Sequence, residues 1–224
     1  MNYALSPLTL LLLLGALAIP SEAQSAPCPD TQFTCRGTTQ TLPGDRGDLF
    51  CPYDDNDGSS GSAAFDYPLG TARMSFTFTR LSLALADSFW FEGLAPGDSV
   101  KCRAKLTLSG QVCGGDVASF FVNFSLVPGE SQAAYFISPD PKHCAPVAGV
   151  LDQLVALRIG ERFAMKLTID GSDGAGGNGV INTALQFSEL PPNVVVRSCH
   201  GFRQDGPVPT LPSSWGNLKA SYRR

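Results

Sequence analysis

Alternation of apolar and polar side chains constrains the fold of this chain more than any other feature of its sequence. Residues 100–108 are apolar at every even position and polar at every odd one. Residues 118–126 and 163–169 repeat the pattern with few exceptions. Because successive side chains of a strand point to opposite faces, a period of two predicts strands with one buried and one solvated face.

Four short clusters rich in glycine or proline separate these runs: residues 95–98, 127–129, 159–161 and 190–193. Such clusters predict turns. The alternation of residues 74–78 resumes out of phase at 81–85, which predicts a bulge or two strands joined near Thr79. Residues 149–157 fit either a helix or a buried strand. We expect an all-β fold, a single-domain antiparallel β-sandwich that is Ig-like or jelly-roll-like.

The first 23 residues are predicted to be a cleaved secretory signal. The apolar run Leu8–Ile19 is too short to cross a bilayer as a helix, and Ser21-Glu22-Ala23 supplies the small residues expected before a cleavage site. We therefore expect a secreted, extracellular protein with no membrane span in the mature chain.

Composition divides the rest of the chain into three segments. Residues 24–70 are expected to form a cysteine-containing, turn-rich segment that packs on the sandwich. Residues 71–203 are expected to form the core of the sandwich. Residues 204–224 contain three of the prolines and end in two arginines, which predicts a stiff linker and a short basic tail.

Seven cysteines follow the signal, and an oxidising compartment predicts that they form disulfides. Spacing alone allows many pairings. The favoured set is Cys35 with Cys51, Cys102 with Cys113, and Cys144 with Cys199. This set leaves Cys28 unpaired. A histidine adjoins Cys144 and another adjoins Cys199, so zinc is an alternative, which is disfavoured because oxidised cysteines do not bind metal.

Charge and the supply of catalytic groups argue against several classes of function. The formal net charge is −4, which gives no field that would attract nucleic acid. The chain has only two histidines and no G-x-S-x-G elbow for a serine hydrolase. No glutamate pairs with a second acid as glycoside hydrolysis requires. We expect a protein that is not an enzyme, and calcium is the one cofactor to consider.

Two acidic loops are the candidates for calcium. Asp54, Asp55 and Asp57 precede a Gly/Ser stretch, and Asp170 and Asp173 begin a glycine-rich loop. Carboxylate oxygens in flexible turns are the ligands that calcium prefers. Neither loop fits the EF-hand pattern, and aspartate and glycine are also ordinary turn formers.

Three other features could contribute to recognition. Trp90 alternates away from the aromatic residues on either side of it and could supply a flat ring for a sugar. Asn123 begins an Asn-Phe-Ser triplet, which is a glycosylation acceptor in a host that glycosylates. Arg46-Gly47-Asp48 is an adhesion-like tripeptide in a turn-rich stretch, composed of residues that also form turns.

Short motifs follow one another in the second half of the chain: Asp87-Ser88-Phe89, Gly97, Leu108-Ser109-Gly110, Gly160-Glu161-Arg162-Phe163, Asn182-Thr183-Ala184, Leu190-Pro191-Pro192-Asn193-Val194, Ser198, Cys199 and Gly201. This order resembles the β-sandwich ectodomain of bacterial exported proteins of the PEP-CTERM kind, most of which have no assigned activity. The resemblance covers residues 71–202 and implies a Gram-negative surface or matrix protein. The Val-Pro-Glu-Pro motif and anchor typical of that group are not found, so surface anchoring is in doubt.

These observations predict a secreted, non-enzymatic structural or interaction protein of a bacterial cell surface or extracellular matrix. Its expected partners are extracellular or cell-surface components, polysaccharide among them, and not nucleic acid. The alternative is a carbohydrate-binding or calcium-binding β-sandwich module, and a hydrolase ranks third.

Overall fold

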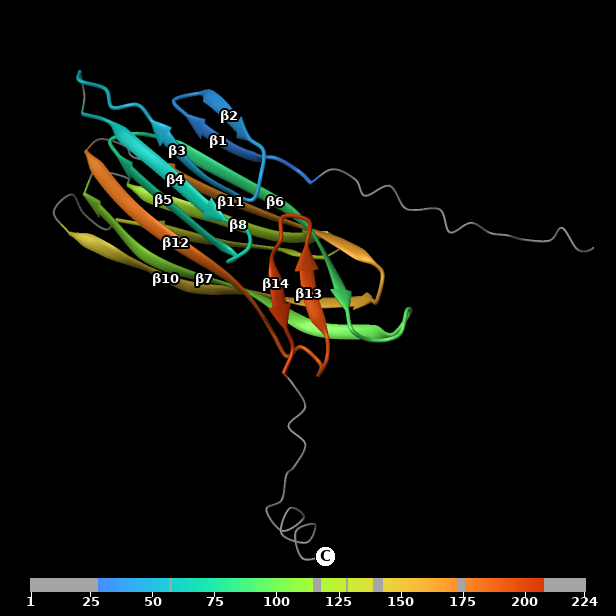
Figure 1. Ribbon diagram of the computed structural model, residues 1–224. Helices are drawn as coiled ribbons and strands as arrows, with labels where there is room; N and C mark the ends of the chain where they lie inside the picture. The colour runs from blue at the N-terminus through green and yellow to red at the C-terminus, as the bar shows by residue number, and fades with distance from the viewer. Residues whose placement is uncertain are drawn as a thin grey trace, which may run out of the picture.

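Two antiparallel β-sheets face each other as a sandwich (Figure 1). The computed structural model describes residues 28–207 apart from 57, 115–117, 128, 139–142 and 173–175. The expected signal and most of the expected tail lie outside these residues. The part of the chain that is described contains fourteen strands and no helix, and so no helix suited to crossing a bilayer. The predicted all-β antiparallel sandwich is confirmed.

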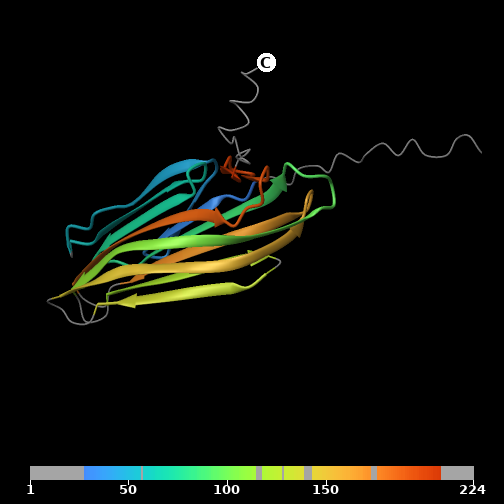
Figure 2. The same cartoon turned by 90° about the horizontal axis from the view of Figure 1, so that it is seen from below.

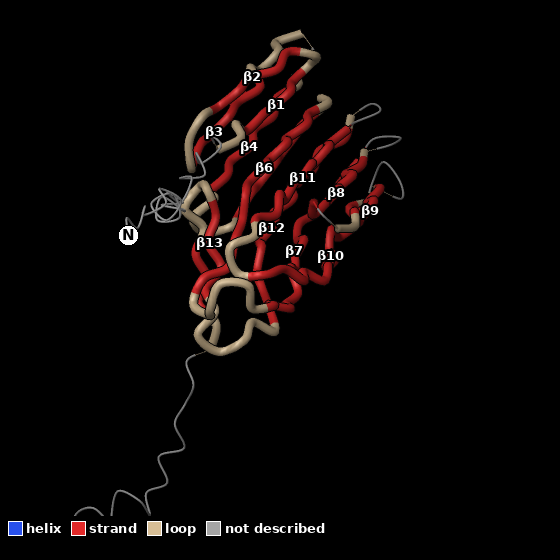
Figure 3. Tube along the Cα trace, turned by 90° about the vertical axis from the view of Figure 1, so that its right-hand side faces the viewer, coloured by secondary structure: helices blue, strands red, loops and turns tan. Residues whose placement is uncertain are grey.

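Sheet A contains eight strands. Six of them follow the order β14-β13-β6-β11-β8-β9, while β1 pairs with β6 and β2 pairs with β1. Figure 3 shows β2, β1, β6, β11, β8 and β9 side by side in this order. The bounds are β1 Thr31–Cys35, β2 Thr38–Leu42, β6 Leu81–Glu92, β8 Ser119–Val127, β9 Ser131–Ile137, β11 Arg162–Ser172, β13 Val195–Ser198 and β14 Arg203–Asp205.

Sheet B contains six strands in the order β10-β7-β12-β5-β4-β3. Figure 2 shows the strands of both layers running along the long direction of the molecule. The bounds are β3 Arg46–Cys51, β4 Ser60–Asp66, β5 Thr71–Thr77, β7 Ser99–Gly114, β10 Cys144–Arg158 and β12 Gly177–Ser188. Residues 149–157 are therefore strand. Four strands of the sandwich itself, β1 to β4, lie within residues 24–70, the segment that was expected to be turn-rich and to pack on the sandwich.

The phase slip expected near Thr79 marks a crossing between the sheets. β5 ends in sheet B and β6 begins in sheet A, so the two alternating runs are separate strands. Phe78 lies between them with a φ of 51°, in the left-handed region. The apolar residues of each run therefore face the core, although the two runs alternate out of phase with each other.

Inward-facing side chains of both sheets form one apolar core. β6 alternates strictly between buried and half-buried residues along all twelve of its positions. Phe89 of β6 lies 5.5 Å from Phe163 of β11 and 5.7 Å from Phe187 of β12, measured between ring centroids. The contact with Phe187 joins the two sheets, and burial of each ring contributes about 25 cal/mol per Å² of apolar surface.

One expected disulfide is present and two are corrected. Cys35 pairs with Cys51, which joins β1 of sheet A to β3 of sheet B. Cys102 and Cys113 lie on the same extended strand, β7. Eleven residues at about 3.4 Å each separate them by about 37 Å, far beyond the reach of a disulfide. Cys102 instead remains a free thiol in the core.

The remaining pairs follow from strand register and chain path. Cys113 pairs with Cys144, its direct partner in the ladder between β7 and β10. Cys144 is therefore not bonded to Cys199. Cys199 pairs with Cys28, which was expected to be unpaired, because the chain entering β1 runs beside the residue that follows β13.

Candidate functional site

A groove on the outer face of sheet A is the best candidate for a binding site. Five strands each contribute one residue to a straight row across this face, because each is the register partner of the next. The row is Thr34, Ser82, Asp170, Phe121 and Tyr135. Strands lie about 4.8 Å apart, so the row extends over about 19 Å. These five residues line a groove of about 810 Å³, which we call groove A.

The two ends of groove A differ in chemistry. Phe121 and Tyr135 stand next to each other at one end, 39% and 58% exposed. Because they are register partners, the two side chains form a contiguous apolar patch, which is the kind of surface that ligands and partners bind. At the other end, Thr34 and Ser82 carry hydroxyls, which both donate and accept hydrogen bonds, and the Thr34 hydroxyl already shares one with Thr39 at 2.9 Å. An aromatic end of groove A is thus followed by a polar end.

Groove A is also lined by two charged side chains that are not paired with other described residues. Asp170 lies in the middle of the row, and Arg80 lines the same groove. Among the described residues, neither side chain has an ion-pair or hydrogen-bond partner. Arg36, a third charged lining residue, is bonded to Asp54 at 3.2 Å. Asp170 and Arg80 can therefore accept from and donate to a bound molecule without first breaking a bond within the protein.

The calcium candidates are dispersed. Asp170 belongs to β11 and faces groove A. Asp54 bonds Arg36 and accepts hydrogen bonds from the backbone and side-chain nitrogens of Asn56, which is a turn arrangement. Asp55 adjoins it, while Asp57 and Asp173 lie outside the described residues. Across the described part of the chain, no three His, Cys, Asp or Glu side chains gather closely enough to hold a metal ion.

Trp90 does not present an open ring. It lies half-buried on the outer face of sheet A, where the Arg162 guanidinium carbon is 4.9 Å from the ring centroid. Its indole N–H donates to Glu92, which in turn bonds Arg197. These hydrogen bonds lower the pKa of Glu92. One face of the ring is covered, so Trp90 is a less suitable sugar platform than Phe121 and Tyr135.

Asn123 follows Phe121 on the same face of β8. It is half-buried, and its side-chain oxygen accepts a hydrogen bond from Ser131 at 2.7 Å. Its modification stays a prediction.

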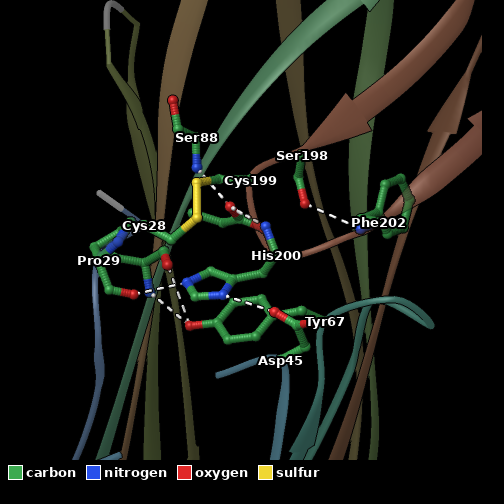
Figure 4. The surroundings of a disulfide bond; sticks show 11 residues. Cys28, Pro29, Asp45, Tyr67, Ser88, Ser198, Cys199, His200 and Phe202 are labelled. Carbon is green, nitrogen blue, oxygen red and sulfur yellow. Dashed lines mark hydrogen bonds and ion pairs between the residues drawn. A yellow bond between two sulfur atoms is a disulfide. The ribbon is translucent and has the colours of Figure 1, made fainter. Parts of the chain in front are cut away.

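A buried polar cluster lies where one edge of β6 lacks a strand partner (Figure 4). β1 pairs with the first part of that edge and β13 with the last. Between them, the Tyr67 hydroxyl donates to the Ala86 carbonyl at 3.1 Å and accepts from the Ala86 amide at 3.2 Å. The Cys199 amide donates to Ser88 at 2.9 Å. The cluster therefore satisfies backbone groups that the missing strand would have bonded.

The same cluster contains the only buried histidine among the described residues, His200. Its ring stacks on Tyr67 at 4.3 Å between centroids. Its two nitrogens contact Asp45 at 3.2 Å and the Pro29 carbonyl at 2.7 Å. Neither contacts a serine hydroxyl, so the histidine is not placed as the base of a serine nucleophile. Its contacts fix the segment that carries Cys28.

Sequence reasoning missed both aromatic residues of groove A. Phe121 carried a usable signal, since it is the one large apolar residue in the polar phase of residues 118–126. Tyr135 lies on β9, whose residues gave no clear alternation, and only the register with β8 places it beside Phe121.

Comparison with known proteins finds no matching family model and no matching curated protein. Among solved structures, the chain is similar to the carbohydrate-binding module TmCBM61 in complex with β-1,4-galactotriose, with 14% identity and a TM-score of 0.25 over 51% of this chain and 70% of that one. It is similar to a structure of carbohydrate-binding modules from the β-sandwich superfamily, with 10% identity and a TM-score of 0.25 over 74% and 87%.

A third similarity is to the enzymatically active domain of bacteriophage CBA120 tailspike protein 4. It has 10% identity and a TM-score of 0.24 over 70% of this chain and 19% of that one. Similarities at this level carry no inference about what the chain binds, which rests on the geometry of its own surface.

Proposed function

We propose that the protein is a secreted carbohydrate-binding β-sandwich module and that groove A holds the sugar chain. The observation that carries the proposal is the row from Thr34 to Tyr135, with two adjacent exposed rings at one end and unpaired polar groups beside them. The C–H face of a sugar ring packs on a flat aromatic side chain, while its hydroxyls both donate and accept hydrogen bonds. Groove A supplies partners for both.

The charges of groove A favour a neutral sugar. Asp170 accepts from hydroxyls and Arg80 donates to them, so the unpaired charges balance. A polyanion would meet Asp170, and a polycation would meet Arg80. The about 19 Å length of the row suits a chain of several sugar units better than a single one.

The proposal keeps the expectations of export and of a non-enzymatic role. Three disulfides support an oxidising, extracellular compartment. Glycoside hydrolysis uses two carboxyl groups across the scissile bond. Asp170 is the only acidic residue among the described residues that line groove A. Binding without turnover is therefore the function that groove A supports best.

Affinity electrophoresis tests the proposal. The native protein is run through gels containing hydroxyethylcellulose, galactan, xylan, glucomannan or polygalacturonate. We expect at least one neutral polysaccharide to retard it. Tyr135→Ala and Phe121→Ala should each weaken that retardation about tenfold, since loss of one stacked ring costs about 1.4 kcal/mol.

Val127→Ala is the matched control, because Val127 is 54% exposed on the same face of β8 but outside groove A. It should leave retardation unchanged. Equal mobility of the native protein in all gels, or equal retardation of all variants, would contradict the proposal.

A further inference from the structure

A second groove lies on the outer face of sheet B. Its floor and walls include the row Asp48, Ala64, Arg73, Asn182 and Ser109, one residue from each of five neighbouring strands. These residues line a groove of about 570 Å³, which we call groove B. Ala64 between Asp48 and Arg73 is small, so the side chains on either side stand above a hollow. Groove B therefore has the same construction as groove A, with one row crossing five strands.

Groove B, like groove A, is lined by one aspartate and one arginine that have no partner among the described residues. Arg46, at its rim, bonds Asp66 at 3.0 Å. Asp48 and Arg73 have no ion-pair or hydrogen-bond partner among the described residues. Asn182 donates one weak bond, to the Ser109 carbonyl at 3.4 Å. The unpaired charges again sum to zero, which suits a neutral ligand rich in hydroxyls.

An exposed aromatic ring adjoins groove B as well. Phe50 is 66% exposed and lies two residues after Asp48 on β3, on the same face of the strand. It lines a separate open hollow of about 440 Å³ together with Ser62 and Ser75, and none of the residues that line this hollow also lines groove B. Phe50, Ser62 and Ser75 are register partners on three adjacent strands. One exposed ring thus stands beside two small hydroxyl side chains, which share a hydrogen bond of 2.8 Å with each other.

We propose that groove B binds a second neutral sugar chain and that the protein cross-links two chains. The inference rests on the proposed function of groove A. The two grooves lie on the outward faces of the two sheets, whose backbones are about 10 Å apart and whose interior is filled by the core. A chain seated straight along one face does not reach the other. Occupation of both grooves therefore joins two separate chains.

Stoichiometry and cross-linking test the inference directly. Cellohexaose, xylohexaose, mannohexaose and β-1,4-galactohexaose are titrated calorimetrically into the native protein. We expect two hexasaccharides per protein for at least one of them. Light scattering of the parent polysaccharide should then rise on addition of protein, because each molecule joins two polymer chains.

Variants in each groove separate the two sites. Asp48→Ala/Arg73→Ala should reduce the stoichiometry to one and abolish the rise in scattering while retaining gel retardation. Phe121→Ala/Tyr135→Ala should likewise leave one site, the one in groove B. Lys101→Ala is the matched control for removal of an exposed charge, because Lys101 lies on the same face of β7 as Ser109 but outside groove B. This variant should keep two sites. Far-UV circular dichroism confirms that each variant is folded.

Four outcomes are distinguishable. Two sites in the native protein, of which each double variant removes one, support both proposals. A single site that only Phe121→Ala/Tyr135→Ala removes overturns the inference and leaves the proposed function standing. A single site that only Asp48→Ala/Arg73→Ala removes overturns groove A as the binding site. No heat of binding with any hexasaccharide and no retardation by any polysaccharide overturn both.

Discussion

At the scale of single residues, Asp87 has a buried carboxyl of which one oxygen lacks a hydrogen-bond partner. Its side chain is buried, and one oxygen accepts hydrogen bonds from the Ser88 amide at 2.7 Å and the His200 amide at 3.3 Å. The other oxygen has no hydrogen-bond partner. Burial raises the pKa of Asp87, and the neighbouring Ser198 hydroxyl, together with the Ser88 and His200 amides, opposes the rise only in part.

Replacing this carboxyl should change how stability depends on pH. Because the pKa of Asp87 is higher in the folded than in the unfolded chain, its protonated form favours folding. That contribution is fully present below the unfolded value of about 3.9 and is lost as pH rises through the folded value. In Asp87→Asn this loss should be absent. Urea denaturation between pH 3 and pH 7 should show the free energy of unfolding of the native protein falling relative to that of Asp87→Asn.

Asp205→Asn is the control for loss of an exposed carboxyl. Parallel stability curves for the native protein and Asp87→Asn across this range would show that Asp87 has no such role.

At the scale of strands, glycine determines how closely β7 and β12 pack at one point. Gly110 of β7 has a φ of 150°, and a Cβ built there would lie 2.0 Å from the Val180 carbonyl oxygen of β12. A backbone atom cannot move away as a flexible side chain can. The register partner of Gly110 on its other side is Val147 of β10, three residues from the disulfide at Cys144.

Gly110→Ala should therefore destabilise the protein by more than about 2 kcal/mol, because it combines a backbone clash with a φ that L-residues rarely adopt. Gly149→Ala is the matched control in the neighbouring strand β10, since its added Cβ would meet nothing closer than 3.6 Å. Thermal denaturation should show a large fall in melting temperature for the first variant and a small change for the second. Similar melting temperatures would show that the strands can separate locally.

The strands were predictable from sequence wherever a single face is buried. Residues 100–108 follow the period of two and form part of β7, because each inward residue meets the core. β2 was not predicted, since Thr38–Leu42 lies at an edge and buries none of its residues fully. Groove A was not predicted as a site either. Its row is defined by the register between strands that are far apart in the chain, such as β11 with Asp170 and β8 with Phe121. The linear pattern of apolar and polar residues contains no information about this register.

At the scale of the whole molecule, the disulfide between Cys28 and Cys199 joins the segment that precedes the first strand to the segment that follows β13. The two cysteines are 171 residues apart in the sequence and 5.6 Å apart between Cα atoms. The pair Cys35–Cys51 spans only 16 residues. A longer closed loop removes more entropy from the unfolded chain, which corresponds to about 5 kcal/mol for the first bond and about 3 kcal/mol for the second.

Removal of the long-range bond should accordingly cost more stability than removal of the short one. Cys28→Ser/Cys199→Ser should lower the urea midpoint further than Cys35→Ser/Cys51→Ser, with both compared to the native protein at the same pH. The reverse order would mean that the inter-sheet bond at Cys35 contributes more in the folded state than loop entropy contributes in the unfolded state.

The buried Cys102 has a consequence for the permanence of these bonds. A thiolate is needed to attack a disulfide, and exchange among bonds requires an accessible attacking sulfur. Burial raises the pKa of Cys102 to about 12, and its side chain is 1% exposed. Once β7 has packed, the odd sulfur can neither ionise nor reach a partner. The folded protein thus carries no internal catalyst for reshuffling its own cross-links, whereas a partly unfolded one does.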